Sequence, residues 1–216
     1  MKKIFQIAID GPSGAGKSTI AKRVAKELAI DYIDTGSMYR AVGLKMLRNG
    51  IPMEENEVLQ KMLDETDVDF ENERVYLDGE DVSDLIRTQE ISKQASDCSA
   101  FATVRNKLVE LQQNMGKRKS VIMDGRDIGT VVLKDAEYKY YLTATPEERA
   151  MRRFKELQAK GSGETYEQVL EDVNKRDYND MNRTVTPLRQ AEDAVLIDST
   201  NMSIDEVVEF IISRIK

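Results

Sequence analysis

The sequence predicts an α/β fold with three layers, in which helices cover both faces of a central parallel sheet of about five strands. Three junctions between a short apolar run and a polar, glycine-containing loop support this prediction, and helical patterns alternate with the apolar runs along the chain. The chain of 216 residues is long enough for one such domain with a small insertion, and short for two full domains. We therefore expect a single domain, residues 1–216.

The first junction lies near the N-terminus. Apolar residues between Ile4 and Ile9 predict a buried strand, and Ile20, Val24 and Leu28 recur at every fourth position of a following helix. The loop between them is Gly11-Pro12-Ser13-Gly14-Ala15-Gly16-Lys17-Ser18, which matches the phosphate-binding pattern G-x-x-x-x-G-K-[ST]. A glycine-rich turn without a ligand is disfavoured, because every fixed position and both flanks are present.

This loop predicts a nucleoside triphosphate site and hence a P-loop NTPase fold. Its backbone N–H groups and the helix N-terminus face an anion, and Lys17 adds a full positive charge. The Ser18 hydroxyl is suited to bind Mg²⁺. The expected ATP-binding residues are Gly11, Pro12, Ser13, Gly14, Ala15, Gly16, Lys17, Ser18 and Thr19.

The composition excludes several kinds of chemistry and partner. The chain has no histidine and one cysteine, Cys98, which rules out Ser-His triads and the usual zinc sites. We expect Cys98 to be a buried small hydrophobe rather than a nucleophile. A net charge of −7 disfavours a nucleic acid or an anionic membrane as the main partner, so an anionic ligand requires locally gathered arginines. We expect a cytoplasmic monomer without a signal peptide or membrane span.

The second junction follows a predicted strand at residues 31–34. The helical pattern beyond it includes Met38, Val42 and Met46. Because ligands gather at the carboxyl ends of strands in open α/β sheets, we expect Asp34, Thr35, Tyr39 and Arg40 on the same rim as the first loop. From the residues alone, Thr35 as a helix cap and Arg40 as a solvated side chain are equally good interpretations.

Residues 54–90 have the character of an insertion. A short helix is expected from Glu54 to Asp64, and a hairpin from residues 68–71 and 74–78 around the turn Asn72-Glu73. So small a unit is expected to pack on the main domain as a flap, where its motion could matter.

Residues 90–115 predict a helix that Gly116 ends, followed by a solvated basic turn at residues 117–119. Ser96 and Arg105 are separated by about two and a half helical turns. They could face one ligand only if the run is bent or broken, which residues 99–102 permit.

The third junction is Val121-Ile122-Met123-Asp124-Gly125-Arg126-Asp127, an apolar strand that ends in alternating charges. Asp124 is placed to hold Mg²⁺ through water, as strand-end aspartates do in P-loop enzymes. Arg126 and Asp127 are expected on the same rim. A surface ion pair is the alternative, which so much charge directly after a core strand disfavours.

The C-terminal third predicts a strand at 138–142, two capped helices joined by Gly161-Ser162-Gly163, a strand at 194–198 and a helix at 203–215. Capping boxes are expected at Thr145, Thr165 and Ser203. The two helices form a lid-like hairpin, about residues 146–183. Within it, Arg149, Lys155 and Lys160 are expected to be ordinary solvated charges. The expected core is then 1–53, 91–145 and 184–216.

Arginines on several segments of one rim suggest a donor triphosphate and an anionic acceptor held face to face. Phosphoryl transfer needs in-line placement and neutralised charge, which Lys17, Mg²⁺ and mobile arginines supply. An acceptor phosphate needs no general base. An acceptor hydroxyl needs a carboxylate, for which Asp34 and Asp127 are the candidates.

Five segments together resemble the bacterial cytidylate kinase family, and the likeness runs along essentially the whole chain. The phosphate loop is shared with many families, whereas the D-G-R-D-I-G-T and G-E-D-V stretches are specific to this one. The segments are Gly11–Ser18, Asp34–Arg40, Gly79–Val82 with Ile86-Arg87-Thr88, Asp124–Thr130, and Arg176-Asp177 with Asn182-Arg183.

The resemblance implies transfer of the γ-phosphoryl group of ATP to CMP or dCMP, with Mg²⁺, in a fold with an acceptor-side flap and a helical lid. It assigns Arg40 and Arg126 to the acceptor phosphate, and Arg152 or Arg153 to the transferring phosphate. It assigns the cytosine base to Thr35, Arg105, Asp127 and Arg183, and the sugar to Ser96, Arg176 and Asp180. Many family members have serine where this chain has Thr35.

Two other functions are weighed beside this one. The first is a kinase of another acceptor on the same fold, either a different nucleoside monophosphate or a small hydroxylated metabolite. The second is a nucleotide-dependent switch that signals through the flap. The number of rim arginines argues against the switch, since one bound triphosphate needs fewer.

Overall fold

The computed structural model describes residues 4–71, 73–159 and 161–215. The chain divides into two compact units. The first unit consists of Met1–Asp31 and Ser120–Lys216, and the second unit is the continuous segment Tyr32–Lys119. These units do not follow the predicted division at residues 54–90 and 146–183. That division concerns which segments act as flap and lid, and it stays a prediction.

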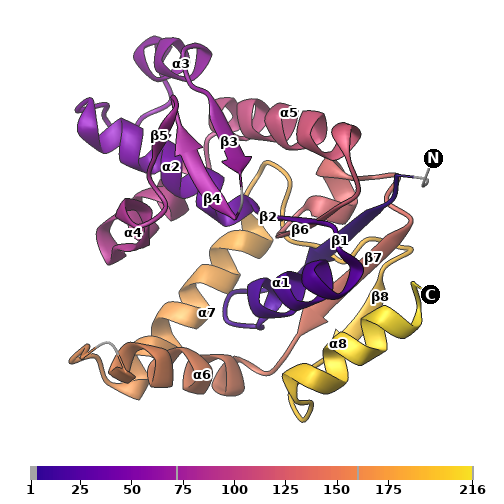
Figure 1. Ribbon diagram of the computed structural model, residues 1–216. Helices are drawn as coiled ribbons and strands as arrows, with labels where there is room; N and C mark the ends of the chain where they lie inside the picture. Colours follow the sequence, from indigo (N-terminus) through magenta and orange to yellow (C-terminus); the bar gives the residue numbers. More distant parts are fainter. Residues whose placement is uncertain (1–3, 72, 160, 216) are drawn as a thin grey trace. The chain divides into compact units, whose positions relative to one another are not determined.

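The first unit contains most of the sheet and the loop at Gly11. Its elements, labelled in Figure 1, are β1 (Gln6–Asp10), α1 (Lys17–Leu28), β6 (Val121–Gly125), the short π-helical turn η2 (Ile128–Val132), β7 (Tyr138–Thr143), α6 (Pro146–Ala159), α7 (Tyr166–Asn182), β8 (Val195–Asp198) and α8 (Ile204–Ser213).

The sheet has five strands in the order β2-β6-β1-β7-β8, where β2 is Asp31–Asp34. β1 pairs in parallel with β6 on one side and with β7 on the other, and β7 pairs in parallel with β8. The central position of β1 explains its apolar run, because a strand between two neighbours is covered on both faces and Ile7, Ala8 and Ile9 are fully buried. The predicted α/β class and the five-stranded parallel sheet with flanking helices are confirmed.

The register brings the ends of three strands to one edge of the sheet. Asp10, the last residue of β1, lies opposite Gly125 of β6 and Tyr141 of β7. The chain segments that leave this edge are the glycine-rich loop, the turn at Arg126 and the residues before α6. The charged residues of the glycine-rich loop and of the turn at Arg126 are therefore held near one another.

Helix pairs of the first unit pack through apolar side chains. α1 lies beside α8 (Figure 1). α6 and α7 form a hairpin whose core contains Ala150, Val169 and Val173, with Phe154 and Tyr166 in an edge-to-face contact at 6.2 Å between ring centroids. The predicted hairpin thus has an apolar seam of its own.

The second unit is mostly helical. Beyond β2, its elements are α2 (Thr35–Arg48), α3 (Glu57–Asp64), β3 (Val68–Glu71), β4 (Arg74–Leu77), β5 (Glu80–Asp81), the 3₁₀ turn η1 (Leu85–Arg87), α4 (Gln89–Cys98) and α5 (Ala102–Arg118). α2 packs against α4, and α3 packs against α5. The predicted hairpin is confirmed, since β3 and β4 are antiparallel with Val68 opposite Leu77; Asn72, in its turn, lies outside the described residues. Cys98 is fully buried, and burial raises its thiol pKa to about 12, as expected for a structural side chain.

Two boundary predictions in this unit are wrong. The run at 90–115 is two helices, because the chain turns at Ser99–Phe101 between α4 and α5. Gly116 does not end α5, which continues to Arg118, because Gly116 does not take the positive φ of a helix-terminating glycine. Lys117 and Arg118 are therefore in the last helical turn, where cations interact favourably with the helix dipole.

Two of the three predicted capping boxes are complete. Thr165 with Gln168 and Ser203 with Glu206 exchange both hydrogen bonds. At Thr145 only half forms: Glu148 donates its N–H to Thr145 Oγ1 (3.3 Å), but the Glu148 carboxylate accepts from Arg152. The Thr145 N–H donates to Thr200 Oγ1 instead, at 3.2 Å. A competing arginine on the next turn explains the difference.

Within the described residues, no helix combines the length and the apolar character that a membrane crossing requires.

Candidate functional site: two clusters of charged side chains

The glycine-rich loop joins β1 to α1 in a conformation that requires glycine. Gly11 has φ +149°, and a Cβ there would lie 1.9 Å from the Leu142 carbonyl oxygen of β7. Gly14 has φ +75° and lies close to Arg149 of α6, with 3.2 Å between its ideal Cβ position and the Arg149 Cβ. The loop thus packs closely against β7 and α6, and these contacts restrict its backbone conformation.

Lys17, at the first position of α1, is buried and turned back on this loop. Its Nζ donates to the Pro12 carbonyl oxygen at 2.7 Å. Burial and the nearby Arg126 charge lower the Lys17 pKa to about 7, against the opposing influence of Asp124, Asp180 and Asp10. A bound polyphosphate would supply the negative charge that keeps this ammonium protonated.

Ser18 and Asp124 meet where a metal ion is predicted. The Ser18 hydroxyl donates to Asp124 Oδ2 at 2.9 Å, and Asp124 is only 5% exposed. These oxygens are the ligand types that Mg²⁺ prefers, and an ion that binds one directly and the other through water would replace their direct hydrogen bond. The residues present therefore fit a magnesium site. No cluster of three or more metal-ligating acidic or Cys side chains occurs in the described ranges.

Asp10 is a buried carboxylate that the sequence analysis did not assign to the site. At the end of β1 it accepts hydrogen bonds from the N–H groups of Ile128 (2.8 Å) and Gly129 (2.7 Å). Burial outweighs these bonds and raises its pKa to about 6. Asp10 therefore holds the turn that follows Arg126 and Asp127. The signal in the sequence was a carboxylate directly after a core strand, the same signal that pointed to Asp124.

The phosphate loop and the charged side chains around it form a group that we call the first cluster. Arg126 and Asp180 form its central ion pair. Arg126 Nε donates to Asp180 Oδ2 of α7 at 2.6 Å. Burial opposes the Arg126 charge, but Asp180, Asp124 and Asp177 outweigh burial and raise the pKa of Arg126. Burial likewise opposes ionisation of Asp180, and Arg126 with its neighbours lowers the Asp180 pKa. Both groups are ionised at neutral pH.

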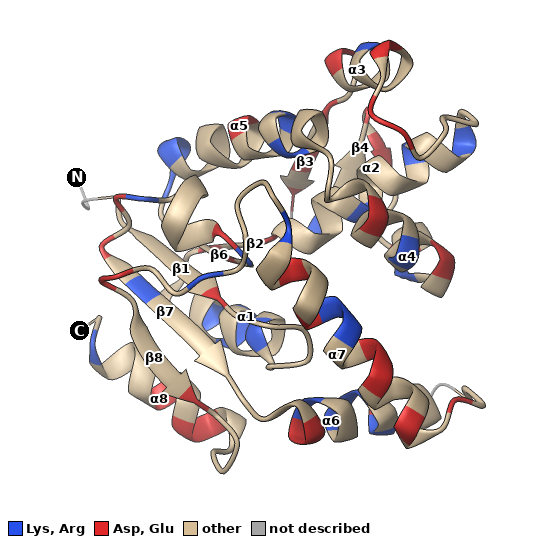
Figure 2. Cartoon of the chain, turned by 180° about the vertical axis from the view of Figure 1, so that it is seen from behind, with Lys and Arg blue, Asp and Glu red and all other residues tan. Residues whose placement is uncertain are grey.

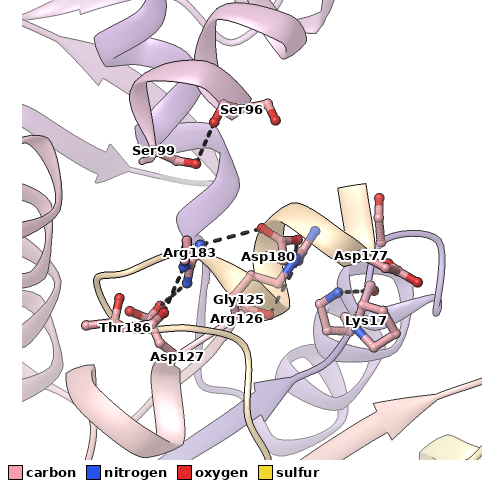
Figure 3. Close-up of polar contacts among 12 residues, drawn as sticks. Lys17, Ser96, Ser99, Gly125, Arg126, Asp127, Asp177, Asp180, Arg183 and Thr186 are labelled. Atoms are coloured by element: carbon pink, nitrogen blue, oxygen red, sulfur yellow. Dashed lines mark hydrogen bonds and ion pairs between the residues drawn. The ribbon is translucent and has the colours of Figure 1, made fainter. Parts of the chain in front are cut away.

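Arg183 extends this cluster toward Asp127, as Figure 3 shows. Its guanidinium lies 3.5 Å from Asp180 Oδ1 and 3.9 Å from Asp127 Oδ1, and its Nε donates to the Thr186 carbonyl oxygen at 2.8 Å. Arg183 and Asp127 are both largely buried. The structure thus brings together seven of the predicted site residues: Lys17, Ser18, Asp124, Arg126, Asp127, Asp180 and Arg183.

The second unit holds a separate cluster at the start of α2. Asp34 caps the helix by accepting from the Ser37 N–H at 3.1 Å, so the interpretation of Thr35 as the cap is wrong. Arg40 is partly buried rather than fully solvated, and its Nη2 donates to Asp34 Oδ2 (3.0 Å) and to Ser37 Oγ (2.7 Å). Thr35 is buried in the first turn. A helix N-terminus with a preorganised arginine suits an anion.

Arg105 joins this second cluster from α5. It is 2% exposed, donates to the Ser99 carbonyl oxygen at 3.0 Å, and stacks over the Tyr39 ring at 5.4 Å from its centroid. The break between α4 and α5 is what supplies the Ser99 carbonyl. Ser96 is exposed on α4, and its carbonyl oxygen accepts from the Ser99 hydroxyl at 2.8 Å.

Of the basic residues in the α6–α7 hairpin that were predicted to be solvated, Arg149 is buried instead. Arg149 is not solvated: it is 3% exposed and pairs with Asp177. Lys155 is exposed as expected, and Lys160 lies outside the described residues. Figure 2 shows charges of both signs along α7.

The predicted lid arginines have different partners. Arg152 is half-buried and donates to the Ser199 carbonyl oxygen at 2.8 Å, whereas Arg153 pairs with Glu156 at 3.2 Å on the same helix. Arg176 is partly buried and makes no hydrogen bond or ion pair to the described residues.

These clusters have the groups that bind polyanions, and they suit a reaction that needs no acid-base catalyst. The first offers a backbone anion site, an ammonium group, a metal-ligating pair and two arginines held by carboxylates. The second offers an arginine at a helix N-terminus and a buried hydroxyl. Such groups neutralise and orient phosphates, and this is the main requirement of phosphoryl transfer.

Comparison with known families gives a match over nearly the whole chain. The family model described as Cytidylate kinase matches residues 7–216. A protein named Cytidylate kinase from Caldicellulosiruptor saccharolyticus is 55% identical over 213 residues, covering 97% of this chain and 94% of its own. Proteins of the same name from Clostridium acetobutylicum and Clostridioides difficile are 53% and 50% identical, and both alignments cover at least 97% of each chain.

Solved structures at low identity share the fold. A shikimate kinase from Bacteroides thetaiotaomicron has a TM-score of 0.51 at 12% identity, with 99% of each chain covered. An uncharacterized protein from Eubacterium ventriosum has a TM-score of 0.54 at 14% identity, with 99% of this chain and 98% of its own covered. These likenesses support the α/β kinase fold alone.

Proposed function

The chain belongs to the cytidylate kinase family, and we propose on that basis that it transfers the γ-phosphoryl group of ATP to CMP and dCMP, forming ADP and CDP or dCDP. The observation that carries the proposal within the structure is the first cluster. It combines the phosphate loop with Arg126, Asp127 and Arg183, three side chains beyond those that a bound triphosphate needs.

The donor is held by residues 11–19. Backbone N–H groups of the loop and the Lys17 ammonium bind the β- and γ-phosphates. The ammonium has three N–H donors, of which the Pro12 carbonyl uses one. Ser18 and Asp124 would hold Mg²⁺, directly and through water, and the ion would neutralise charge on the phosphates. Arg152 or Arg153 would approach the transferring group from α6.

The acceptor phosphate is assigned to Arg40 and Arg126. Each is preorganised by a carboxylate, Asp34 for Arg40 and Asp180 for Arg126, which fixes the direction of its guanidinium and leaves other N–H groups for a ligand. The attacking phosphate oxygen is already an anion, so no general base is required. The absence of histidine is consistent with this mechanism.

The cytosine base is assigned to Thr35, Arg105, Asp127 and Arg183. The Asp127 carboxylate would accept from the exocyclic amine of cytosine, which uracil lacks. Arg183 lies beside it, 3.9 Å from Asp127 Oδ1, and would help to orient that carboxylate. Ser96, Arg176 and Asp180 would contact the sugar, and Tyr39 would support Arg105 by stacking. We also propose that the chain acts as a monomer on these small-molecule substrates.

The proposal is tested by ADP formation from Mg-ATP in a coupled assay. CMP, dCMP, UMP, AMP and no acceptor are compared side by side. Strong stimulation by CMP and dCMP, weak stimulation by UMP and none by AMP are expected. If no acceptor raises the rate above background, the assignment fails, and a kinase of another metabolite or a nucleotide switch becomes the working function.

Asp127→Asn tests the base assignment. Asparagine can present its NH₂ group as well as its oxygen, so discrimination between cytosine and uracil should fall. We expect kcat/KM for CMP to decrease at least about tenfold relative to that for UMP. Asp135→Asn is the matched control, because Asp135 is an exposed carboxylate eight positions along the same segment. Unchanged CMP preference in Asp127→Asn would remove Asp127 from the base site.

A further inference from the structure

Arg149 is a buried arginine on a helix whose other basic residues reach the surface. It lies in the first turn of α6 and is 3% exposed. Arg152, Arg153 and Lys155 on the same helix are each more exposed. Burying a guanidinium is costly unless its hydrogen bonds are made, so its partners account for its position.

Those partners come from three separate segments. Arg149 Nε donates to the Ala144 carbonyl oxygen at the end of β7 (2.9 Å), and Nη1 donates to the Ser13 carbonyl oxygen of the phosphate loop (3.0 Å). Nη2 pairs with Asp177 Oδ2 of α7 at 2.6 Å. Each of the three guanidinium nitrogens is therefore used by a different segment. A lysine has a single nitrogen and cannot reproduce this planar fork.

The bond to Ser13 acts on the loop that receives the donor. The Ser13 carbonyl and the Gly14 N–H belong to one planar peptide and point in opposite directions. A donor that holds this carbonyl therefore turns the Gly14 N–H away from Arg149 and fixes its direction. Gly14 also approaches the Arg149 backbone, with 3.2 Å from its ideal Cβ position to the Arg149 carbonyl oxygen. The loop rests on the first turn of α6.

The bond to Asp177 connects the same peptide to α7. Asp177 is buried, and its other oxygen, Oδ1, has no hydrogen-bond partner in the described chain. Arg149 is the one cation that pairs directly with Asp177 among the described residues. Asp180, one turn further along α7, holds Arg126. Arg149 thus connects the Ser13 peptide to the helix that also carries a partner of the acceptor-site arginine.

We propose that Arg149 is a positioning residue for the phosphoryl donor: it fixes the Ser13–Gly14 peptide of the phosphate loop and, through Asp177, couples that peptide to α7. The role of the loop in holding ATP rests on the proposed function. Arg149 touches neither substrate nor metal in this role; it acts through the main chain of the loop.

Two variants separate positioning from simple stabilisation. Arg149→Lys keeps the charge near Asp177 but loses the fork. Arg149→Met alone would leave Asp177 charged, buried and unpaired, so it is combined with Asp177→Leu, which replaces the ion pair by an apolar pair. Lys155→Met is the matched control, an exposed cation on the same helix.

The first readout is the dissociation constant of Mg-ATP measured by calorimetry without any acceptor. We expect a loss of about tenfold in both Arg149→Lys and the double variant, the scale of one hydrogen bond from a charged donor, and no change in Lys155→Met. The second readout is the KM for CMP at saturating ATP, which should stay within about twofold in Arg149→Lys. Unfolding temperatures establish that each variant is folded.

Several outcomes would overturn the proposal. Wild-type ATP affinity in a folded variant would make Arg149 a structural residue only, as would equal losses for ATP and CMP. Failure of both variants to fold would have the same meaning. The wild-type chain with CMP tests the proposed function separately: absence of CMP-stimulated ADP formation with normal ATP binding would reject the kinase assignment and leave the role of Arg149 in donor binding standing.

Discussion

Lys17 shows at the scale of one residue how the site is prepared for its ligand. The side chain is buried, folded back on Pro12, and has its pKa lowered to about 7. It is held in this state by desolvation, which disfavours the charged form until an anion arrives. The lysine is therefore poised close to its titration point at neutral pH.

Binding of ATP should consequently take up protons above pH 7. The free chain has partly neutral Lys17 there, whereas the complex needs the ammonium, so the dissociation constant should increase with pH by up to about tenfold per unit. Calorimetry between about pH 7 and 8.5, in buffers of different ionisation enthalpy, measures the proton uptake directly. This range lies above the titration of Asp10, whose pKa is about 6.

Lys17→Arg serves as the control, because arginine remains charged throughout this range. Whatever the ATP affinity of this variant, its binding of ATP should be accompanied by no proton uptake from this side chain. Equal proton uptake in wild type and Lys17→Arg would mean that another group titrates on binding.

The residues that the sequence analysis missed are those whose role depends on burial. Ser18, Asp124 and Arg126 could be predicted because each lies in a motif or directly after an apolar strand. Arg149 lies in a helix with Arg152 and Arg153, and helical spacing gives no sign that one guanidinium faces Ser13 and Asp177. Asp10 was not assigned to the site because the motif that begins at Gly11 accounted for that part of the sequence. Ser13 and Asp177 are both far from Arg149 in the sequence, and only the tertiary fold brings them close to it.

At the scale of elements, periodicity and caps predicted the structure well where they act locally. The strand at 31–34, the hairpin β3–β4 and the caps of α7 and α8 depend on neighbouring residues, and they formed as expected. The turn at Ser99–Phe101 was different, since no glycine or proline marks it. α4 packs on α2, and α5 packs on α3 and also on α2, an arrangement that the break permits. Competition between tertiary and local preferences explains the error.

Substitution of Gly11 by alanine should break the junction between β1 and the loop. The new Cβ would overlap the Leu142 backbone of β7 at a φ unfavourable for L residues. We expect a loss of at least about 3 kcal/mol in the free energy of unfolding, measured by urea denaturation.

Gly163→Ala is the comparison for this prediction. Apart from its chain neighbours, no described residue has a heavy atom within 4 Å of the position of its Cβ, and its φ is not in the left-handed region. A change below about 0.5 kcal/mol is expected. Similar losses for both substitutions would mean that the close approach at Gly11 is relieved by movement of β7.

The cap of α8 gives a smaller effect at a helix end. Ser203 accepts from the Glu206 N–H at 3.2 Å, and its own N–H and hydroxyl both donate to the Glu206 carboxylate at 2.8 Å. Ser203→Ala should cost about 1 kcal/mol of unfolding free energy, while Ser203→Asp should retain most of it because aspartate also caps. Identical urea midpoints for wild type and Ser203→Ala would contradict this reading of the cap.

The stability of the whole molecule should depend on pH through two buried groups. Asp10 has a folded-state pKa of about 6, raised from 3.8, so between these values the folded chain keeps a proton that the unfolded chain has released. Its contribution therefore falls as pH rises from about 4 to 6, by up to ~3 kcal/mol. Lys17, lowered from 10.5 to about 7, acts oppositely: its contribution rises as pH increases above 7. Together they favour a minimum between about pH 6 and 7.

Urea unfolding of wild type and Asp10→Asn across about pH 4 to 8 checks this dependence. The variant should be less stable overall if one of the two N–H bonds is lost, yet the decline between about pH 4 and 6 should be weaker than in wild type. An equal slope in both proteins would show that Asp10 does not cause it.

The strand order of the sheet also affects when the sheet can form during translation. β1 and the phosphate loop are synthesised well before both strands that flank β1, with Gln6 opposite Val121 and Ile7 opposite Tyr138. The continuous segment Tyr32–Lys119 has its own packed helices, and we expect it to begin folding before β1 has its neighbouring strands. The strands and backbone that surround the nucleotide-binding loop are thus complete only once β6 and β7 have been synthesised, and we expect no ATP binding by a nascent chain before then.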